Sequence, residues 1–265
     1  MNYLSNETVL WNLFIQIIEP NYPSQIGLRG RPRSDLRQIF SGCLYILRTG
    51  CTWRNLPSEF GPFSTCHGYF LKWTRAGFIE KLWIMIRTVC SAFNGYDRSI
   101  ETIDASERHV KNMKGKNAGY GYKIKGKRAV KITILSDKDG LPVGLDVHKS
   151  GPHDVTRFKQ ALKDGHKIPG LQAESIILGD AGYLGNEPIK EAIKLGCHVI
   201  TSKRINQKCQ NTPKEKKLLK KYRWQSESLF SELYSYARVE RCLDFTPEAF
   251  KSWSLLALIC IIASV

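Results

Sequence analysis

Residues 175–183 read Ser175-Ile-Ile-Leu-Gly-Asp180-Ala-Gly-Tyr183, a short apolar run that ends on an aspartate and is followed at once by a glycine turn. This pattern predicts a buried strand with Asp180 at its carboxyl end. A second run of the same design, residues 99–104, places Asp104 at its end. If the two strands are neighbours, their carboxylates converge, and converging carboxylates repel each other without a cation. The pair therefore predicts a hard divalent metal with oxygen ligands, Mg²⁺ or Mn²⁺.

The composition combines an ordinary apolar content with a strong positive charge. The chain has 265 residues, 42% of them hydrophobic, and its 40 Lys and Arg against 24 Asp and Glu leave a net charge of +16. The length allows one large or two modest domains. The charge suits a polyanion such as nucleic acid, or an anionic membrane surface. Nucleic acid is the better interpretation, because the basic residues lie in predicted loops without an amphipathic helix beneath them.

Neither the start of the chain nor its cysteines indicate export. The first residues lack the basic start and long apolar block of a secretory leader, so we expect the protein to stay in the cytosol. The eight cysteines include no Cys-x-x-Cys pair, which argues against a zinc module and a disulfide scaffold. The apolar run that closes the chain is too short for a membrane span and predicts a buried helix instead.

The first 95 residues show helical periodicity and predict a helical DNA-binding domain over residues 1–95. Apolar spacing, caps and breakers place its helices at residues 4–18, about 35–48, 64–75 and 78–93. The third of these completes a helix-turn-helix-like unit and shows His67, Lys72 and Arg75 to solvent, as a recognition helix in a major groove would. The alternative is a small bundle whose basic residues keep it soluble.

Arginines mark a second DNA-binding candidate in the same domain. Residues 28–33 read Leu-Arg-Gly-Arg-Pro-Arg, where glycine and proline prevent regular structure and the arginines project from an extended backbone. Such a segment fits a minor groove and resembles an AT-hook core, although basic loops are often merely solvated. The predicted DNA contacts of the domain are Arg29, Arg31, Arg33, Arg54, His67, Lys72 and Arg75.

Beyond residue 95 the periodicity changes and predicts an α/β domain over residues 96–265. Strands are expected at residues 100–104, 128–136, 141–148, up to 178 and 197–201, and helices at residues 154–163, 187–195 and about 213–241. The order βββαβαβα fits a ribonuclease H-like fold, a mixed five-stranded sheet with helices on both faces. A last helix is expected to start at Pro247.

Two basic stretches flank the predicted aspartate pair. Residues 108–131 hold nine Lys or Arg and no acid, and residues 203–223 hold nine against the single Glu215. A phosphate backbone would be drawn to them, although both could be plain solvated loops. The predicted DNA contacts here are Lys123, Lys125, Lys127, Arg128, Lys220, Lys221 and Arg223.

Metal-dependent phosphodiester chemistry usually requires a third carboxylate, and two glutamates of the predicted helix 213–241 compete for that role. At about 100° per residue, Glu240 shares a stripe with Leu229 and Leu233, whereas Glu227 projects opposite, beside Arg223. From the pattern alone, Glu227 could equally be a solvated helix glutamate. Arg223, one turn earlier, could pair with it or with a phosphate.

These residues resemble bacterial insertion-sequence transposases of the IS5 family along nearly the whole chain. The amino-terminal likeness is carried by Gly30-Arg-Pro-Arg-Ser-Asp-Leu-Arg37, by Leu44-Tyr-Ile-Leu-Arg-Thr-Gly-Cys-Thr-Trp-Arg-Asn-Leu-Pro57 and by Phe60-Gly-Pro62. The catalytic-domain likeness is carried by Asp104-Ala-Ser106, Gly140-Leu-Pro142, Gly151-Pro-His-Asp154, Asp180-Ala-Gly-Tyr183 and Arg223-Trp-x-x-Glu227.

The resemblance implies a DDE triad of Asp104, Asp180 and Glu227 that binds two Mg²⁺ (or Mn²⁺) ions. It implies an endonuclease and strand-transfer enzyme that acts in transposition and DNA recombination. Its partners would be double-stranded DNA, both the terminal inverted repeats of the insertion sequence and the target, and a second copy of the chain in a homodimer or higher oligomer on DNA. Its location would be the bacterial cytoplasm, associated with the nucleoid, with no membrane partner.

Two departures from the family leave other interpretations open. The family often has an arginine directly after its glutamate and a lysine seven residues on, both used against the transposon end, where this chain has Ser228 and Tyr234. These residues favour the alternative of a catalytically silent DNA-binding protein. A further alternative is a ribonuclease H-like nuclease that cleaves without joining. For the His153-Asp154 pair, a role near the scissile phosphate and a helix cap explain the residues equally well.

Overall fold

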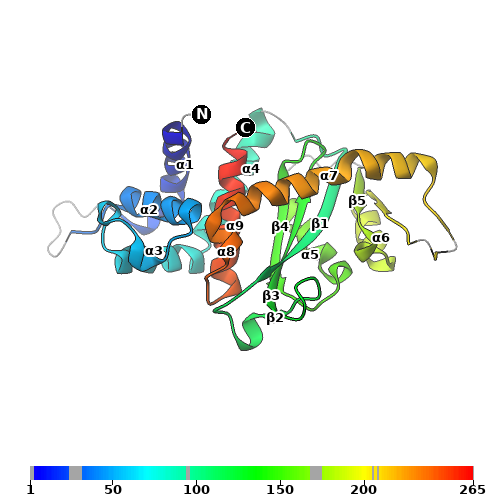
Figure 1. Cartoon of the computed structure of the whole chain (residues 1–265). Coiled ribbons are helices and arrows are strands. Elements are labelled where there is room, and N and C mark those ends of the chain that lie inside the picture. Colours follow the sequence, from blue (N-terminus) through cyan, green and yellow to red (C-terminus); the bar gives the residue numbers. More distant parts are fainter. Residues whose placement is uncertain are drawn as a thin grey trace. The chain divides into compact units, whose positions relative to one another are not determined.

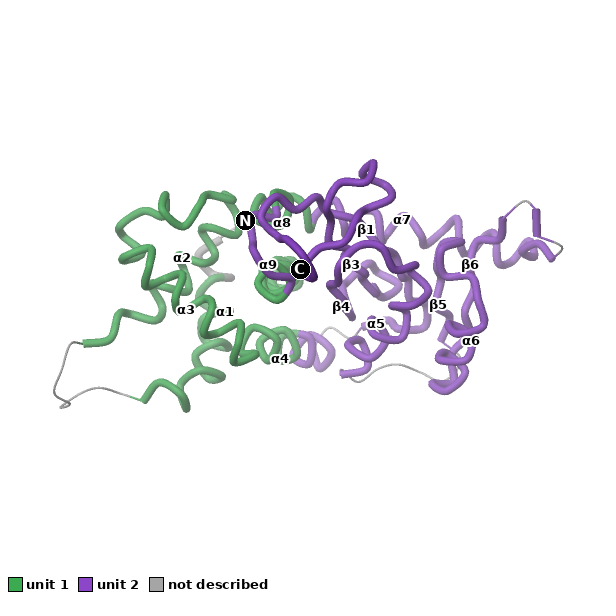
Figure 2. The backbone as a smooth tube through the Cα atoms, turned by 90° about the horizontal axis from the view of Figure 1, so that it is seen from below, with its two compact units in different colours: residues 1–86, 233–241, 248–265 green, residues 87–232, 242–247 purple. Residues whose placement is uncertain are grey.

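The structure is a computed structural model that describes residues 3–23, 32–93, 96–167, 175–204, 206–207 and 209–264, with side chains from residue 7 onward. The chain forms two compact units, shown in Figure 2. Unit 1 contains Met1–Ile86, Leu233–Arg241 and Glu248–Val265, and unit 2 contains Arg87–Glu232 and Cys242–Pro247. Because both units are discontinuous in sequence, the single domain boundary after residue 95 stays a prediction.

Unit 1 is helical. Its elements are α1 (Tyr3–Ile18), α2 (Leu36–Thr49), α3 (Phe63–Arg75), the first part of α4 (Phe78–Phe93), α8 (Ala237–Arg241) and most of α9 (Pro247–Ile262). Aromatic rings fill its core: Phe70 stacks on Trp253 with ring centroids 4.1 Å apart, and Phe14 contacts Phe40 at 4.8 Å. The buried carboxy-terminal helix expected from the sequence is α9. In the described part of the chain, no helix has the length and apolar character needed to cross a bilayer.

The ends of α2 explain one difference from the sequence prediction. Asp35 caps the helix by accepting hydrogen bonds from the backbone of Arg37 and Gln38, and Gly50 ends it in the left-handed region at φ 63°. A Cβ on Gly50 would lie 2.9 Å from Ala237, the first residue of α8. The prediction of one helix over residues 213–241 is wrong. The helix α7 (Pro213–Ser235) ends at Ser235, and a separate helix, α8, begins at Ala237, which packs closely on Gly50.

Unit 2 contains a mixed sheet with the predicted ribonuclease H-like topology (Figure 1). Its strands are β1 (Ile100–His109), β2 (Gly119–Tyr120), β3 (Arg128–Ser136), β4 (Pro142–Lys149), β5 (Ile176–Gly179) and β6 (His198–Thr201). The main order is β4-β3-β1-β5-β6, with β3 antiparallel to β1 and β4, and with β1, β5 and β6 parallel. The short β2 pairs with the start of β3, so the sheet has six strands where five were predicted.

Helices cover both faces of this sheet, as the sequence predicts. On one face, Ile103 and Ile177 pack with residues of α5 (Phe158–Gly165) and α6 (Asn186–Ile193). On the other, Leu178 packs with Leu219 and Tyr222 of α7. Because side chains alternate along a strand, even-numbered residues of β5 face α7, and so does Asp180 if the alternation continues. Figure 1 shows α7 across the sheet and α5 and α6 against its other side.

Strand β1 is longer than predicted, and this corrects the place of Asp104. The strand pairs with β3 from Thr102 through to His109, so Asp104 lies in its middle rather than at its end. The continuation, Ala105 to His109, is mostly polar and carries no apolar alternation from which a strand could be predicted. It extends the sheet toward the basic residues that follow.

A buried ion pair at the start of β1 gives a prediction about stability. Arg98 Nε lies 2.6 Å from Glu101 Oε1, and both side chains are fully buried. We expect Glu101→Ala to lower the free energy of unfolding by about 3 kcal/mol, because it leaves a buried guanidinium without its carboxylate. Urea denaturation should show a much smaller loss for Arg98→Met combined with Glu101→Leu, which removes both charges. Equal losses in the two variants would contradict a role for the pair.

Asp137, in the β3–β4 turn, gives a prediction about pH. Its Oδ1 accepts hydrogen bonds from the backbone of Asp139 and Leu141, and burial raises its pKa to about 7. Because this pKa lies above the unfolded value, the stability due to the protonated carboxyl is complete below about pH 4 and is lost as the pH rises to about 7.

We therefore expect Asp137→Asn, whose amide oxygen can accept the same bonds, to gain stability relative to wild type between pH 5 and pH 8. The gain should be about 1.4 kcal/mol for each unit by which the pKa is raised, a few kcal/mol at most. Urea denaturation across this range measures it, with Glu187→Gln, an exposed position on α6, as the control. A stability difference that does not change with pH would contradict the raised pKa.

Candidate active site

The strand register brings the two predicted aspartates side by side. In the parallel pair of β1 and β5, Ile103 lies opposite Gly179, the last paired residues. Asp104 is the next residue of β1, and Asp180 directly follows β5. The two aspartates therefore lie at the same level on neighbouring backbone segments, which are about 4.8 Å apart in a sheet. Both are partly buried. The neighbouring-strand condition on which the predicted pair depended is thus met.

Short backbone contacts hold each carboxylate. Asp104 Oδ1 accepts from the backbone N–H of Ala105 at 2.7 Å, and Asp180 Oδ1 accepts from Gly182 at 2.8 Å. The second bond caps the short 3₁₀ turn Ala181–Tyr183. A Cβ on Gly182 would lie 2.9 Å from Asp180 Oδ1 and 3.0 Å from Asp154 Oδ2. A side chain at Gly182 would therefore have to displace the carboxylate of Asp180 and crowd that of Asp154.

The electrostatics around Asp104 are those of a crowded anionic site. Burial raises the pKa of Asp104, the charge of Asp180 raises it further, and Lys123 and Arg223 act in the opposite direction. The pKa of the buried Tyr183 is raised well above its usual value by burial and by Asp154, Asp104 and Asp180. These shifts show that three carboxylates and two cationic side chains share one neighbourhood.

Polar contacts fix α7 over β1. Ser226 donates its hydroxyl to Thr102 Oγ1 at 2.7 Å, and Gln225 donates to the carbonyl of Lys138. Arg223 is partly buried and lies 3.3 Å from Ser202 Oγ. Glu227 follows Arg223 by one turn and is exposed. Of the two competing glutamates, Glu227 belongs to unit 2 with both aspartates, whereas Glu240 belongs to unit 1.

The structure does not bring Glu227 into one group with Asp104 and Asp180. Across the described residues, no three His, Cys, Asp or Glu side chains are gathered closely enough to hold a metal ion. The structure thus assembles the aspartate pair, and Glu227 as a third ligand stays a prediction.

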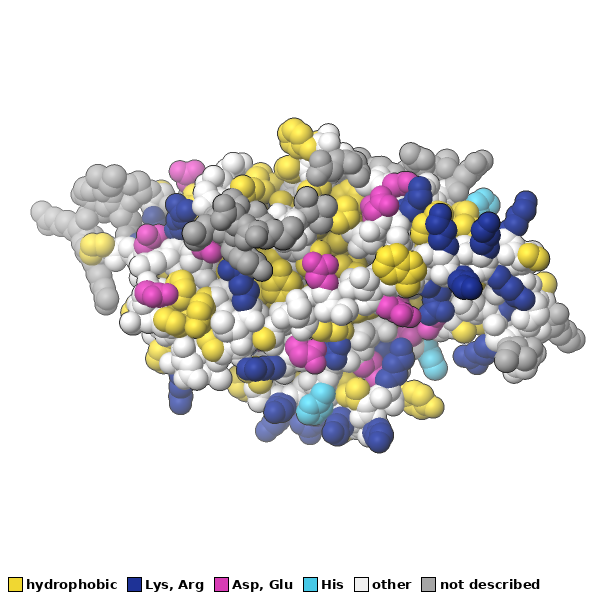
Figure 3. All heavy atoms as spheres, turned by 45° about the horizontal axis from the view of Figure 1, so that its top comes forward, with side chains coloured by type: hydrophobic (Ala, Val, Ile, Leu, Met, Phe, Trp, Pro, Cys, Tyr) yellow, Lys and Arg dark blue, Asp and Glu magenta, His cyan; other side chains and the backbone are white. Residues whose placement is uncertain are grey.

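Cationic side chains surround this region of unit 2. Apart from Arg223, the predicted DNA contacts before and at the start of β3 and on α7 are all exposed: Lys123, Lys125, Lys127, Arg128, Lys220 and Lys221. Figure 3 shows Lys and Arg side chains gathered over the amino-terminal part of α7 and along the edge that carries residues 121–127, between β2 and β3. Their placement is compatible with a phosphate backbone that approaches the aspartates.

The predicted DNA contacts of unit 1 differ in their surroundings. Arg54, Lys72 and Arg75 are exposed, whereas His67 is partly buried with its ring 4.9 Å from that of Trp53. Arg33 donates to the carbonyls of Tyr22 and Pro23. Arg29 and Arg31 lie outside the described residues. His67 is thus less open to solvent than Lys72 and Arg75, because its ring packs on that of Trp53, and its contact with DNA stays a prediction.

An ion-pair group beside the aspartates was missed by the sequence reasoning. Asp154 does not cap a helix, as one alternative held; its Oδ1 accepts from Lys131 Nζ at 2.7 Å. Lys131 also lies 3.8 Å from Glu107, which is buried in the extension of β1. Because the predicted strand ended at Asp104, no sequence signal connected Glu107 with the site.

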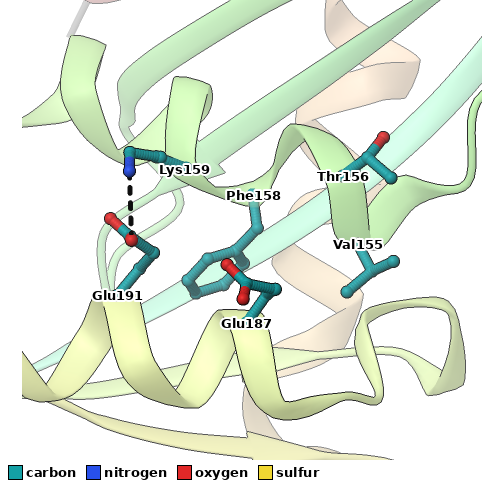
Figure 4. Close-up of a pocket in the computed structure, with 6 residues that line it drawn as sticks. All are labelled: Val155, Thr156, Phe158, Lys159, Glu187 and Glu191. Atoms are coloured by element: carbon teal, nitrogen blue, oxygen red, sulfur yellow. Dashed lines mark hydrogen bonds and ion pairs between the residues drawn. The ribbon is translucent and has the colours of Figure 1, made fainter.

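A pocket between α5 and α6 is unsuited to the same chemistry (Figure 4). It is lined by Val155, Thr156, Phe158, Lys159, Glu187 and Glu191. Lys159 pairs with Glu191 at 3.1 Å, and the remaining charge, on Glu187, is negative. A phosphate would find no available cation there.

Comparison with known proteins found an insertion-element protein and, at low structural similarity, solved transposase structures. Over 99 residues the chain is 31% identical to "Insertion element IS402 uncharacterized 16.2 kDa protein" of Burkholderia cepacia, across 37% of this chain and 67% of the relative. The catalytic domain of Mos1 mariner transposase is 12% identical, with a TM-score of 0.29 over 66% of this chain and 90% of that one. The Mos1 strand transfer complex is 9% identical, with a TM-score of 0.30 over 86% and 80%.

Two protein families match the sequence itself. Residues 9–83 match the family described as "Putative transposase of IS4/5 family", and residues 95–263 match the family described as "Transposase DDE domain". The second match covers well over half of the chain and contains Asp104, Asp180 and Glu227. The chain therefore belongs to the DDE transposases of the IS4/5 family.

Proposed function

We propose that this protein binds the terminal inverted repeats of its own element and cleaves and joins DNA strands at a site built on Asp104, Asp180 and Glu227. The observation that supports the proposal is the parallel register of β1 and β5, in which Ile103 lies opposite Gly179 and the next residues are Asp104 and Asp180. Two carboxylates this close repel each other, and Lys123 and Arg223 are the cationic side chains that act on Asp104, so a bound cation would relieve a cost that the fold otherwise carries.

The donor set fits hard divalent cations. Asp104 and Asp180 offer only oxygen atoms, and a cation held between them would offset the burial and the charge of Asp180 that raise the pKa of Asp104. We assign Asp104, Asp180 and Glu227 as the residues that would hold two Mg²⁺ or Mn²⁺ ions. When bound, such ions lower the pKa of an attacking water or 3′-hydroxyl and offset charge on the leaving oxygen.

The side chains around the carboxylates have roles of their own. Arg223 and Lys123 place positive charge beside Asp104 and are suited to orient the scissile phosphate. The lysines of α7 and of residues 121–127 would contact the phosphate backbone of the adjacent DNA and supply affinity that does not depend on the DNA sequence. Sequence recognition we assign to unit 1, through Arg54, Lys72 and Arg75 of the helix-turn-helix-like part and the arginines of residues 29–33. A homodimer or higher oligomer on DNA follows from the need to cut two ends together.

Ser228 and Tyr234 favour a second candidate, a catalytically silent protein that still binds the repeats. Both stand where the family often carries basic residues against the transposon end, and Ser228 is exposed with no charge to offer. In this case the repeats would be bound and protected but never cut.

The deciding experiment is the incubation of a labelled duplex, which carries the element's terminal repeat and its flank, with the full-length protein in Mg²⁺ and in EDTA. We expect nicking at the repeat boundary in Mg²⁺ alone, followed by joining to a target duplex. A scrambled repeat is the matched control. Tight repeat binding without cleavage in either condition would support the silent protein, and cleavage without joining would support a nuclease.

A further inference from the structure

The segment between β2 and β3 is an ordered turn. Gly121 donates its N–H to the carbonyl of Lys127 at 2.9 Å, and Gly126 donates back to Gly121 at 3.0 Å. Lys125 and Gly126 both have positive φ, at 55° and 71°, which reverses the chain between these bonds. Residues 121–127 therefore present their side chains from a defined backbone, and we name this segment the β2–β3 turn.

A buried glutamate fixes the turn to the strand that carries Asp104. Glu107 is 8% exposed, and its Oε2 accepts from the backbone N–H of Lys123 at 3.0 Å while its Oε1 accepts from Ser150 at 3.1 Å. A Cβ on Gly121 would lie 2.7 Å from the same carboxylate, so only glycine permits this approach. Glu107 follows Asp104 by three residues, about 10 Å along the strand.

The turn displays one aromatic ring among cations. The side chain of Tyr122 is 96% exposed, and Lys123, Lys125 and Lys127 of the same turn are exposed as well. A single exposed tyrosine is unremarkable on a protein surface. An aromatic ring interleaved with cations on a rigid support is the arrangement that binds single-stranded nucleic acid, because every base has a π-face and every nucleotide a phosphate.

We propose that Tyr122 stacks on an unpaired nucleobase of the DNA strand whose backbone lies along Lys123 toward Asp104 and Asp180. The occupant is a single-stranded stretch at the DNA end, since bases within an intact duplex already stack on one another. This inference rests on the proposed function, because cleavage and joining at the DNA end are what would separate its strands. The stacking itself needs no catalysis.

The test uses the full-length protein in EDTA, so that no cleavage is required. The probes are a duplex with a short single-stranded 3′ overhang that contains 2-aminopurine, and the same duplex with a blunt end. We expect Tyr122→Leu to weaken binding of the overhang about tenfold, the effect of losing one base–aromatic stack. Binding of the blunt duplex should stay unchanged. Tyr122→Phe, which keeps the ring, should bind both probes as wild type does and quench the 2-aminopurine fluorescence equally.

The control is Tyr120→Leu, since Tyr120 is the other exposed tyrosine nearby and lies in β2. An equal loss in this variant, or an equal loss for both probes in Tyr122→Leu, would overturn the assignment. The salt dependence of binding should not change in Tyr122→Leu, because no charge is removed. If the wild-type protein never cleaves DNA but Tyr122→Leu loses overhang binding alone, the proposed function is wrong and the stacking role of Tyr122 stands. If the wild-type protein cleaves normally and Tyr122→Leu binds the overhang as wild type does, the stacking role is wrong and the proposed function stands.

Discussion

Asp104→Asn is expected to reduce strand cleavage about a thousandfold or more while the protein keeps or gains stability. The amide oxygen of asparagine can still accept the N–H of Ala105, so the local backbone is preserved. Because burial and Asp180 raise the pKa of Asp104, its ionised form opposes folding, and this cost grows as the pH rises. Removal of the charge therefore eliminates an oxygen that we propose as a metal ligand, and it removes a repulsion in the same step. Cleavage assays and urea denaturation at neutral pH measure the two effects.

Asp180→Asn should lose cleavage to the same extent, since the register makes the two residues equivalent members of one pair. Asp139→Asn is the matched control, because Asp139 is exposed on the β3–β4 turn of the same unit and changes the net charge equally. Cleavage that survives in either site variant, or that fails in Asp139→Asn, would contradict the aspartate pair as the reaction centre. A large loss of stability in Asp104→Asn would show instead that the carboxylate supports the fold.

Much of the architecture follows from the sequence because periodicity and caps are local signals. The alternation in residues 128–136 predicts β3 with its observed bounds, and the cap at Asp35 with the stop at Gly50 predicts α2 almost to the residue. The aspartate pair could be predicted for the same reason, because each strand shows an apolar run followed by an aspartate. Only the pairing of the two strands had to be assumed.

The features that escaped prediction depend on partners distant in sequence. The polar half of β1 is a strand because β3 pairs with it residue by residue, and nothing within residues 105–109 records this. The break between α7 and α8 reflects the packing of Ala237 on Gly50, which lies far away in sequence. Tertiary contacts thus decide where a strand continues and where a helix ends, and these were the places where local reasoning failed.

The third carboxylate lies between these two cases. Helical phase alone separates Glu227 from Glu240 but cannot say which face of the helix meets the sheet. The structure supplies that face: Leu219, Tyr222 and Ser226 contact the strands, and Arg223 lies near enough to Asp104 to lower its pKa. Glu227, one turn beyond Arg223 and in the same unit as the aspartates, is then the better candidate, although its side chain is exposed and stands apart from the pair.

Glu227→Gln is accordingly expected to abolish cleavage, by about a thousandfold or more, with binding of the repeat duplex unchanged or slightly tighter. The exposed amide disturbs no packing, so stability should stay within about 0.5 kcal/mol of wild type. Glu240→Gln is the matched control, since it makes the same chemical change at an exposed helix position in unit 1. Cleavage and repeat binding are measured on the same labelled duplex. If Glu240→Gln loses cleavage and Glu227→Gln does not, the wrong glutamate has been assigned. If neither loses it, the aspartate pair alone supports the reaction, and α7 serves only to bind DNA.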